Sequence, residues 1–268
     1  ETPHRISWDR PLSFDTLTHL QLAKTPKIRQ DWIASEHTYG VTGRVVASTH
    51  PEAWMQTLEV ARDTHSRCLL GIHPWWATHY TTQARRSHLE WLAARRDVTG
   101  LGEIGLDYAR AKTKQERTQQ QTVLEEQLAL AIEYSWPVLL HCVRAHSDLL
   151  HILRGFSKST IRGVFHGWTG GPQYVAPAMD LGLYLSFGPA VLNGRRVKIQ
   201  SAARLVPLDR LCIETDWPDA WHQVRHTPKS GYLRAIAGKV AALRGTQTSE
   251  VWTVCGINAK TLWDNSNG

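Results

Sequence analysis

Short apolar segments alternate with longer helical patterns along the whole chain, and this alternation limits the fold more than any other feature. The apolar segments are rich in Val, Ile and Leu, as is typical of strands buried in a parallel sheet. Eight strands are expected, at 12–17, 43–48, 68–73, 98–104, 137–141, 161–166, 182–187 and 210–214. Helices are expected at 51–64, 80–96, 115–135, 145–156, 172–181, 198–206, 229–244 and 248–264. The pattern predicts an α/β fold, a (β/α)8 TIM barrel.

The length of the chain fits one such barrel. A chain of 268 residues could also hold two domains of ~150 residues, but a barrel of ~250 residues is equally ordinary. The sequence contains no Pro/Ser/Gly-rich linker, low-complexity tract or internal repeat. We therefore expect residues 1–268 to form a single domain.

Cysteine usage and hydropathy bear on the cellular compartment. Cys68, Cys142, Cys212 and Cys255 are widely spaced and mostly lie in apolar segments, which predicts buried, reduced thiols and no cysteine-based zinc site. No apolar run approaches the ~18 residues that a membrane span needs. The polar segment 1–10 does not resemble a secretory signal. A cytoplasmic protein without a membrane partner is the expectation.

Ionisable residues stand at or just past the C-terminal end of six of the eight expected strands. They are His19, His73, Glu103, His141, His166, Glu214 and Asp216. The same end of a (β/α)8 barrel carries the active site. One histidine in such a place is usually structural, but its repetition over six strands is hard to explain by chance.

The residue types in this set favour metal chemistry. Four imidazoles with carboxylates and no thiolate suit two borderline divalent ions bridged by a carboxylate. Glu103 lies among glycines in GLGEIGLDY, where space near the backbone is open, and is the natural bridge. Asp216 in ETDWP could serve as both a metal ligand and a general base. Two ions ~3.5–4 Å apart would act together on a phosphoryl group.

An ordered series of motifs resembles the TatD family of metal-dependent nucleases over nearly the whole chain. The motifs are FDTLTHL, GIHPWW, GEIGLDY, QQTVLEEQLALAI, PVLLHC, GVFHGWTGG, LYLSFG and IETDWP, followed by the terminal helix with Asn258. HCVRAHSDLLHIL and ETDWPD look closest to the branch of YjjV-like proteins. The resemblance implies a barrel with two divalent metal ions (Mg, Mn or Zn) and a phosphodiesterase reaction, commonly exonuclease-like cleavage of DNA.

The resemblance also assigns roles to individual residues. It implies a first metal bound by His19, Glu103 and Asp216, and a second metal bound by Glu103, His141 and His166. Catalysis would rest on Asp216 and Glu103. His73 corresponds to the histidine of a GxHP motif that lines the family's site and is expected to contact phosphate.

Leu17 departs from the family pattern. In the family the first strand carries His-x-His, whereas this chain has Leu17 and His19. Leucine cannot bind a metal, and loss of even an outer-shell partner typically costs ~10–100-fold in affinity or activity. Asp15 is not an obvious replacement, because it is itself a usual member of the family motif. The resemblance therefore predicts a weakened, under-occupied first metal site.

Aromatic and basic residues near the strand ends indicate a nucleic-acid substrate. Trp75, Trp168 and Trp217 follow candidate site residues and could stack nucleobases, although packing is the alternative for each. Arg144 follows the fifth expected strand and could contact phosphate. The net charge of +7 and the isoelectric point near 9.4 also fit a polyanionic partner, or simply a basic protein. Single-stranded DNA or duplex ends are the expected substrate.

Three functions remain open on the sequence. The favoured one is a metal-dependent deoxyribonuclease whose first metal site is weakened by Leu17. The second is a catalytically impaired barrel that binds nucleic acid or a partner protein. The third is a hydrolase of small amides or esters. Glu103 argues against the third, because many such barrels bridge their metals with a modified lysine on the fourth strand.

Overall fold

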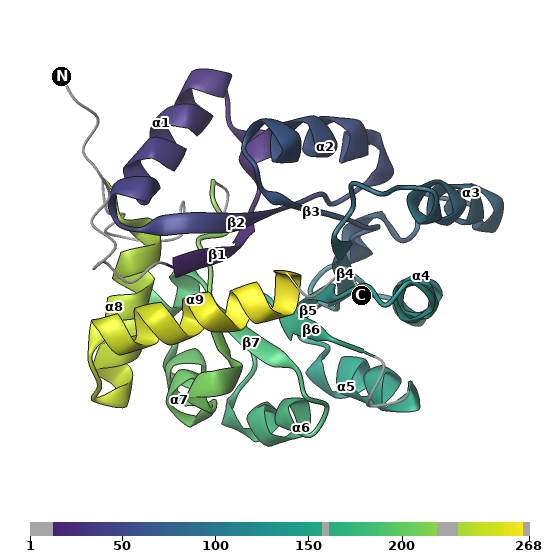
Figure 1. The fold of residues 1–268 in the computed structure, drawn as a ribbon. Coiled ribbons are helices and arrows are strands. Elements are labelled where there is room, and N and C mark those ends of the chain that lie inside the picture. The colour runs from purple at the N-terminus through teal and green to yellow at the C-terminus, as the bar shows by residue number, and fades with distance from the viewer. Residues whose placement is uncertain (1–12, 157–160, 219–229, 265–268) are drawn as a thin grey trace.

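The computed structural model describes residues 13–156, 161–218 and 230–264, which form one barrel surrounded by helices (Figure 1). Segment 1–10, the first residue of the expected strand 12–17 and the first residue of the expected helix 229–244 lie outside these ranges. The eight strands are β1 (Ser13–Thr18), β2 (Val41–Ala47), β3 (Arg67–Leu70), β4 (Gly100–Asp107), β5 (Val138–Val143), β6 (Gly163–Phe165), β7 (Tyr184–Phe187) and β8 (Leu211–Ile213). Each of the eight coincides with a predicted strand.

The strands lie in the sheet in the order in which they occur in the chain, β1 to β8, and all neighbouring strands are parallel. The ring closes between β1 and the segment after β8. There the amide of His19 donates to the Trp217 carbonyl at 2.7 Å, and the amide of Asp216 donates to the Leu17 carbonyl at 3.0 Å. The predicted (β/α)8 barrel is confirmed.

Helices cover the outside of the barrel. They are α1 (Pro26–Thr38), α2 (Trp54–Asp63), α3 (Thr82–Ala93), α4 (Lys114–Glu133), α5 (His146–Gly155), α6 (Val175–Met179), α7 (Val197–Leu205), α8 (Tyr232–Arg244) and α9 (Thr248–Asp264). None of the described helices is long and apolar enough to cross a membrane.

Helix α1 was not predicted from the apolar pattern. Only Trp32 and Glu36 are buried on it, so the sequence carries no periodic apolar stripe over this segment. Its start is nevertheless marked. The Thr25 hydroxyl accepts a hydrogen bond from the Ile28 amide at 3.2 Å, and Pro26 occupies the first helical turn.

Strands β4 and β5 are longer than predicted. The sequence predicts their ends at residues 104 and 141, but the ladder continues to the pair Asp107 and Val143. Gly105 allows this pairing, because a Cβ at this position would overlap the backbone of His141 and φ here is +147°. Glu103 and His141 therefore lie within their strands and not at the strand ends.

Apolar side chains fill the barrel interior below the polar residues. This inner cluster includes Leu17, Val45, Leu69, Leu139, Val164 and Cys212. Leu262 and Trp263 of α9 belong to the same cluster, so α9 closes one end of the barrel, where Figure 1 shows it crossing the strands. All four cysteines are buried and free, as predicted. The polar residues of interest gather at the other end.

Candidate metal centre and substrate cavity

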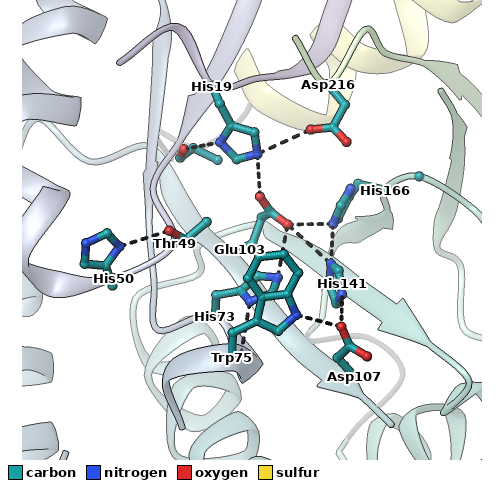
Figure 2. Close-up of polar contacts among 12 residues, drawn as sticks. His19, Thr49, His50, His73, Trp75, Glu103, Asp107, His141, His166 and Asp216 are labelled. Atoms are coloured by element: carbon teal, nitrogen blue, oxygen red, sulfur yellow. Dashed lines mark hydrogen bonds and ion pairs between the residues drawn. The ribbon is translucent and has the colours of Figure 1, made fainter. Parts of the chain in front are cut away.

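The carboxylate of Glu103 is the centre of the polar cluster (Figure 2). Its Oε1 lies 2.8 Å from Nε2 of His19, and its Oε2 lies 2.7 Å from Nε2 of His166. Nδ1 of His141 is 3.5 Å from the same Oε2 and 3.1 Å from Nε2 of His166. One buried carboxylate therefore faces three imidazoles. His19, just after β1, faces Oε1, whereas His141 in β5 and His166, just after β6, face Oε2.

Backbone hydrogen bonds place Glu103 and His73 over the barrel mouth. The amide of Glu103 donates to the Ser48 carbonyl at 3.0 Å, and the amide of His73 donates to the Thr49 carbonyl at 2.9 Å. The pairing of β4 with β5 is irregular between Leu101 and Ile104, around Glu103. The tops of β2, β3 and β4 are thus tied together directly beneath the candidate site.

Three imidazoles turn one ring nitrogen toward Glu103 and have an acceptor group behind the other. Nδ1 of His19 lies 2.9 Å from the Ala47 carbonyl, which can only accept, so this nitrogen carries the proton. Nε2 of His141 lies 3.4 Å from the Asp107 carboxylate, and Nδ1 of His166 lies 3.6 Å from Glu214. Carboxylates and carbonyls behind histidines fix the tautomer of metal ligands in this way.

His73 differs from these three histidines, because its proton lies on the nitrogen that faces the site. Its Nδ1 accepts a hydrogen bond from the Trp75 amide at 3.2 Å, so in the neutral ring the proton lies on Nε2. This Nε2 points toward Oε2 of Glu103 at 3.6 Å. The ligand atoms of His73, Glu103 and His141 come within 4.8 Å of one another, yet the tautomer makes His73 a hydrogen-bond donor toward the site. His166 is the better third ligand.

The donor set of the second site fits a divalent ion. Tetrahedral ligands with bonds of ~2.0–2.1 Å stand ~3.3–3.4 Å apart. The facing atoms of Glu103, His141 and His166 are separated by 2.7 to 3.5 Å. Two nitrogens and one carboxylate oxygen, without sulfur, suit Zn²⁺ or Mn²⁺ in this position.

Charges in the cluster are strongly coupled. Burial alone would raise the pKa of Glu103, but the facing His166 and His19 hold this pKa well below its usual value. Burial alone would lower the pKa of His19 and of His166, but Glu103 raises both well above the usual value. A bound cation would take over the role of these two imidazolium protons. Burial, together with His141, instead lowers the pKa of His73.

Leu17 lies in β1, two residues before His19, which follows the end of that strand. The Leu17 side chain is fully buried in the inner cluster. The Asp15 carboxylate does not replace a ligand. It accepts hydrogen bonds from the Thr215 amide at 2.8 Å and from the Thr215 hydroxyl at 2.6 Å.

Asp216 completes the first site from the segment after β8. Its Oδ1 lies 3.3 Å from Nε2 of His19, and 24% of its side chain is exposed, far more than of Glu103 at 4%. The backbone of Asp216 has a φ of +50°. A carboxylate that borders both the cluster and solvent can bind a cation and also accept a proton from water.

A cavity of about 1300 Å³ opens above the cluster. Its lining includes His19, His73, Trp75, Glu103, His141, Arg144, His166 and Asp216. Trp75 is 43% exposed, and the Arg110 guanidinium lies 4.2 Å above its ring. The structure thus brings together the ligands inferred by resemblance with the predicted phosphate-binding arginine and one predicted stacking tryptophan.

Two other tryptophans that were expected to stack nucleobases lie outside this lining. Trp168 is 1% exposed and packs edge-on against Phe165 at 5.3 Å between ring centroids. Trp217 is 8% exposed and stacks on Trp32 of α1 at 4.8 Å. Both rings are buried by packing and do not offer a face to a nucleobase.

Sequence reasoning missed the role of Asp107 and assigned none to Glu214. Asp107 accepts a hydrogen bond from the Trp75 indole at 2.6 Å and faces His141. Burial would raise its pKa, but His141 and Trp75 hold it well below the usual value. Glu214 is fully buried behind His166 and accepts the Gly167 amide. The signal for Asp107 was its position four residues after Glu103, on the same face of an extended strand.

Comparisons with known proteins agree with this geometry. A family profile described as "TatD related DNase" matches residues 14–264. The "3'-5' ssDNA/RNA exonuclease TatD" of Pantoea vagans is 30% identical over 259 residues, which cover 93% of this chain and 98% of that protein. The protein of the same name from Erwinia amylovora is 30% identical over 261 residues, covering 93% and 99%.

A solved structure shows the same architecture. The crystal structure of YJJV, described as a TatD homolog from Escherichia coli, superimposes with a TM-score of 0.84 at 26% identity, covering 94% of this chain and 98% of that one. The family profile spans almost all described strands and helices, and the sequence and structure comparisons agree. This chain therefore belongs to the TatD related DNase family.

Proposed function

We propose that this protein is a divalent-metal-dependent phosphodiesterase that shortens single-stranded DNA or RNA from an end. The observation that carries the proposal is the convergence of His19, His141 and His166 on one buried carboxylate, Glu103, at the floor of an open cavity. The relatives from Pantoea vagans and Erwinia amylovora are named as 3'-5' exonucleases of single-stranded DNA and RNA. They support both the substrate class and action from an end.

The residues divide into two candidate sites that share Glu103. Glu103, His141 and His166 would hold one ion, and His19, Asp216 and Glu103 would hold a second. Bound divalent ions (Mg²⁺, Mn²⁺ or Zn²⁺) would polarise a phosphoryl oxygen and lower the pKa of a water molecule. The donor chemistry of both groups, nitrogen and carboxylate oxygen without sulfur, supports this assignment.

Other side chains would orient the phosphate and move the proton. His73 presents an N–H toward the site and is suited to donate a hydrogen bond to a phosphate oxygen. Asp216 borders solvent and would accept a proton from water as general base. Arg144, exposed in the cavity lining, would contact phosphate, and Trp75 would stack a base.

Cleavage assays with the purified full chain test the proposal. Single-stranded DNA and RNA oligonucleotides labelled at the 5' or the 3' end would be incubated with Mg²⁺, Mn²⁺ or Zn²⁺, and a parallel sample would contain a chelator. We expect stepwise shortening from one end, which the chelator abolishes. Absence of cleavage with every metal, together with retained DNA binding, would instead support the second function, a catalytically impaired barrel that only binds. Leu17 is the residue that suggests this alternative.

A further inference from the structure

The cavity is not centred on the metal ligands but extends over the loops after β5, β6 and β7. The loop after β6 carries Tyr174, which closes the 3-10 turn Pro172–Tyr174 and lines this extension. Tyr174 is half-buried and packs against the hydrophobic core. Trp168, on the same loop, is buried and is not part of the lining. Tyr174 is therefore the aromatic side chain that this wall offers to the cavity.

Tyr174 is held in a fixed orientation. Its ring stacks on His146 with centroids 5.0 Å apart and an interplanar angle of 21°. His146 in turn lies edge-on against Trp168 at 5.1 Å. The hydroxyl of Tyr174 lies 3.2 Å from Oγ of Ser147. One ring face is thus supported by a buried histidine, and the phenol is anchored at its polar end.

The backbone locks the same group together. A Cβ at Gly170 would lie 2.6 Å from Trp168 and 2.8 Å from Cδ2 of His146, so the loop rests directly on these two rings. This close approach needs glycine and leaves the aromatic layer little freedom to rearrange. A rigid, supported ring binds a flat ligand without a large loss of side-chain entropy.

Cations flank the aromatic layer. Arg144 precedes His146 by two residues, is exposed, and lines the cavity with a φ of +55°. Arg196, just before α7, and Lys198, in the first turn of α7, also line it. Arg144, Arg196 and Lys198 are exposed, whereas Glu103 is buried. Exposed cations beside an aromatic ring suit a nucleic-acid strand whose phosphates contact the cations and whose base contacts the ring.

From these contacts we infer that Tyr174, supported by His146, is the stacking platform for a nucleobase of the strand bound in this cavity, with Arg144 on a nearby phosphate. The inference rests on the proposed nuclease function and deepens it by naming a base subsite. The interaction needs only the π-face of a base and is therefore independent of sequence. The substrate it selects is a strand with unpaired, accessible bases.

Binding without turnover tests the subsite. The full chain is kept in chelator, and its affinity for a fluorescein-labelled single-stranded oligonucleotide is measured by anisotropy. A second oligonucleotide carries base-free (abasic) residues at its 3' or 5' terminal positions. We expect Tyr174→Leu to weaken binding of the normal strand about 5–100-fold, the range for loss of one base–aromatic stack. Tyr174→Phe, which keeps the ring, should bind close to wild type.

Two comparisons separate the base contact from a structural effect. Tyr134→Leu removes an exposed tyrosine that stacks on Trp136 outside the cavity, and it should leave binding unchanged. On the abasic strand, wild type and Tyr174→Leu should bind equally, because the partner of the ring is missing. If Tyr174→Leu does not fold, the loss of wild-type affinity at one abasic position still tests the contact.

An equal loss of affinity on both strands, or no loss on either, would overturn the subsite. Wild-type binding that is indifferent to abasic residues at every terminal position would do the same. These outcomes are independent of the proposed function, which fails only if metal-loaded wild-type protein cleaves no nucleic acid. A protein that cleaves but ignores Tyr174→Leu would keep its function and lose this inference.

Discussion

The two sides of Glu103 are built unequally. On the side of Oε2, His141 and His166 stand at 3.5 and 2.7 Å, and each has a carboxylate behind it, Asp107 or Glu214. On the side of Oε1, His19 stands alone at 2.8 Å with a backbone carbonyl behind it, and Asp216 reaches in from solvent. Leu17, two residues before His19, is buried in the inner cluster.

Under the proposed function, this difference predicts two metal sites of unequal strength on one barrel. The side of His141 keeps a full set of ligands with oriented tautomers, as a tightly held ion requires. The side of His19 also has three candidate ligands, but only one of them is an imidazole, and the Asp216 carboxylate is 24% exposed to solvent. A site with one imidazole fewer and a ligand open to water is expected to hold its ion less tightly. We expect the two ions to bind with clearly different affinities.

The largest effect is expected for Glu103→Gln, because this substitution should impair both sides of the centre at once. Gln keeps the shape of the side chain but loses the charge that both sites share, so both ions should be weakened together. Nuclease activity should fall by more than about 100-fold, beyond the typical loss from an outer-shell change. The assay is cleavage of single-stranded DNA with parallel metal analysis. Glu125→Gln on the exposed face of α4 is the matched control. Undiminished cleavage would exclude the shared-carboxylate mechanism or reveal a contaminating nuclease.

Asp107→Asn should act on the side of His141 alone. The carboxylate lies 3.4 Å from Nε2 of His141 and favours the tautomer with the proton on that nitrogen, so its loss is expected to weaken the tighter ion about 10–100-fold. Calorimetric titration with Mn²⁺ measures this effect. Trp75→Phe, which removes only the indole donor to Asp107, is the control and should change metal affinity far less. Equal effects of Asp107→Asn on both binding steps would contradict the division into two sides.

Leu17→His should strengthen the side of His19. The new imidazole would stand two residues before His19, at the position where the family pattern has the first histidine of its pair. Occupancy of the weaker ion and the cleavage rate should then both rise, most visibly at low metal concentration. Without metal the variant should be less stable by about 1–3 kcal/mol, because a polar ring would replace a buried leucine. Metal-dependent thermal unfolding and cleavage at limiting Mn²⁺ measure these changes.

The control for this variant is Leu17→Met, which conserves volume without adding a ligand. It should leave metal affinity unchanged. A folded Leu17→His protein that binds no more metal and cleaves no faster would mean that the first site has been remodelled beyond one substitution. The binding-only function would then be favoured.

The smallest effect concerns pH. In the metal-free protein the pKa values of His19 and His166 are raised well above the usual value because both face Glu103. A metal must displace these protons, so its affinity should increase as pH rises through the raised pKa values and fall as pH drops. Calorimetry in two buffers of different ionisation enthalpy measures the protons released. His73→Gln should not alter this number, because burial lowers the pKa of His73. Binding without proton release would contradict the assigned charge states.

Strand positions were predictable because they depend on local patterns. Buried strands are short runs of Val, Ile and Leu, and ligands such as His19 and His166 follow these runs directly. Helix α1 escaped because it buries only Trp32 and Glu36, so its sequence has no stripe to detect. The ends of β4 and β5 were misplaced because the close approach at Gly105 depends on the neighbouring strand.

The sequence by itself determined the barrel, the strand order of the candidate ligands and the absence of a histidine at position 17. These features follow from periodicity and from the identity of single residues. The tertiary structure decided which nitrogen of each histidine faces Glu103, that Trp168 and Trp217 pack away from the cavity, and that Tyr174 borders it. The reason is physical: tautomers, stacking and exposure depend on neighbours from distant strands and loops, and no local pattern records those neighbours.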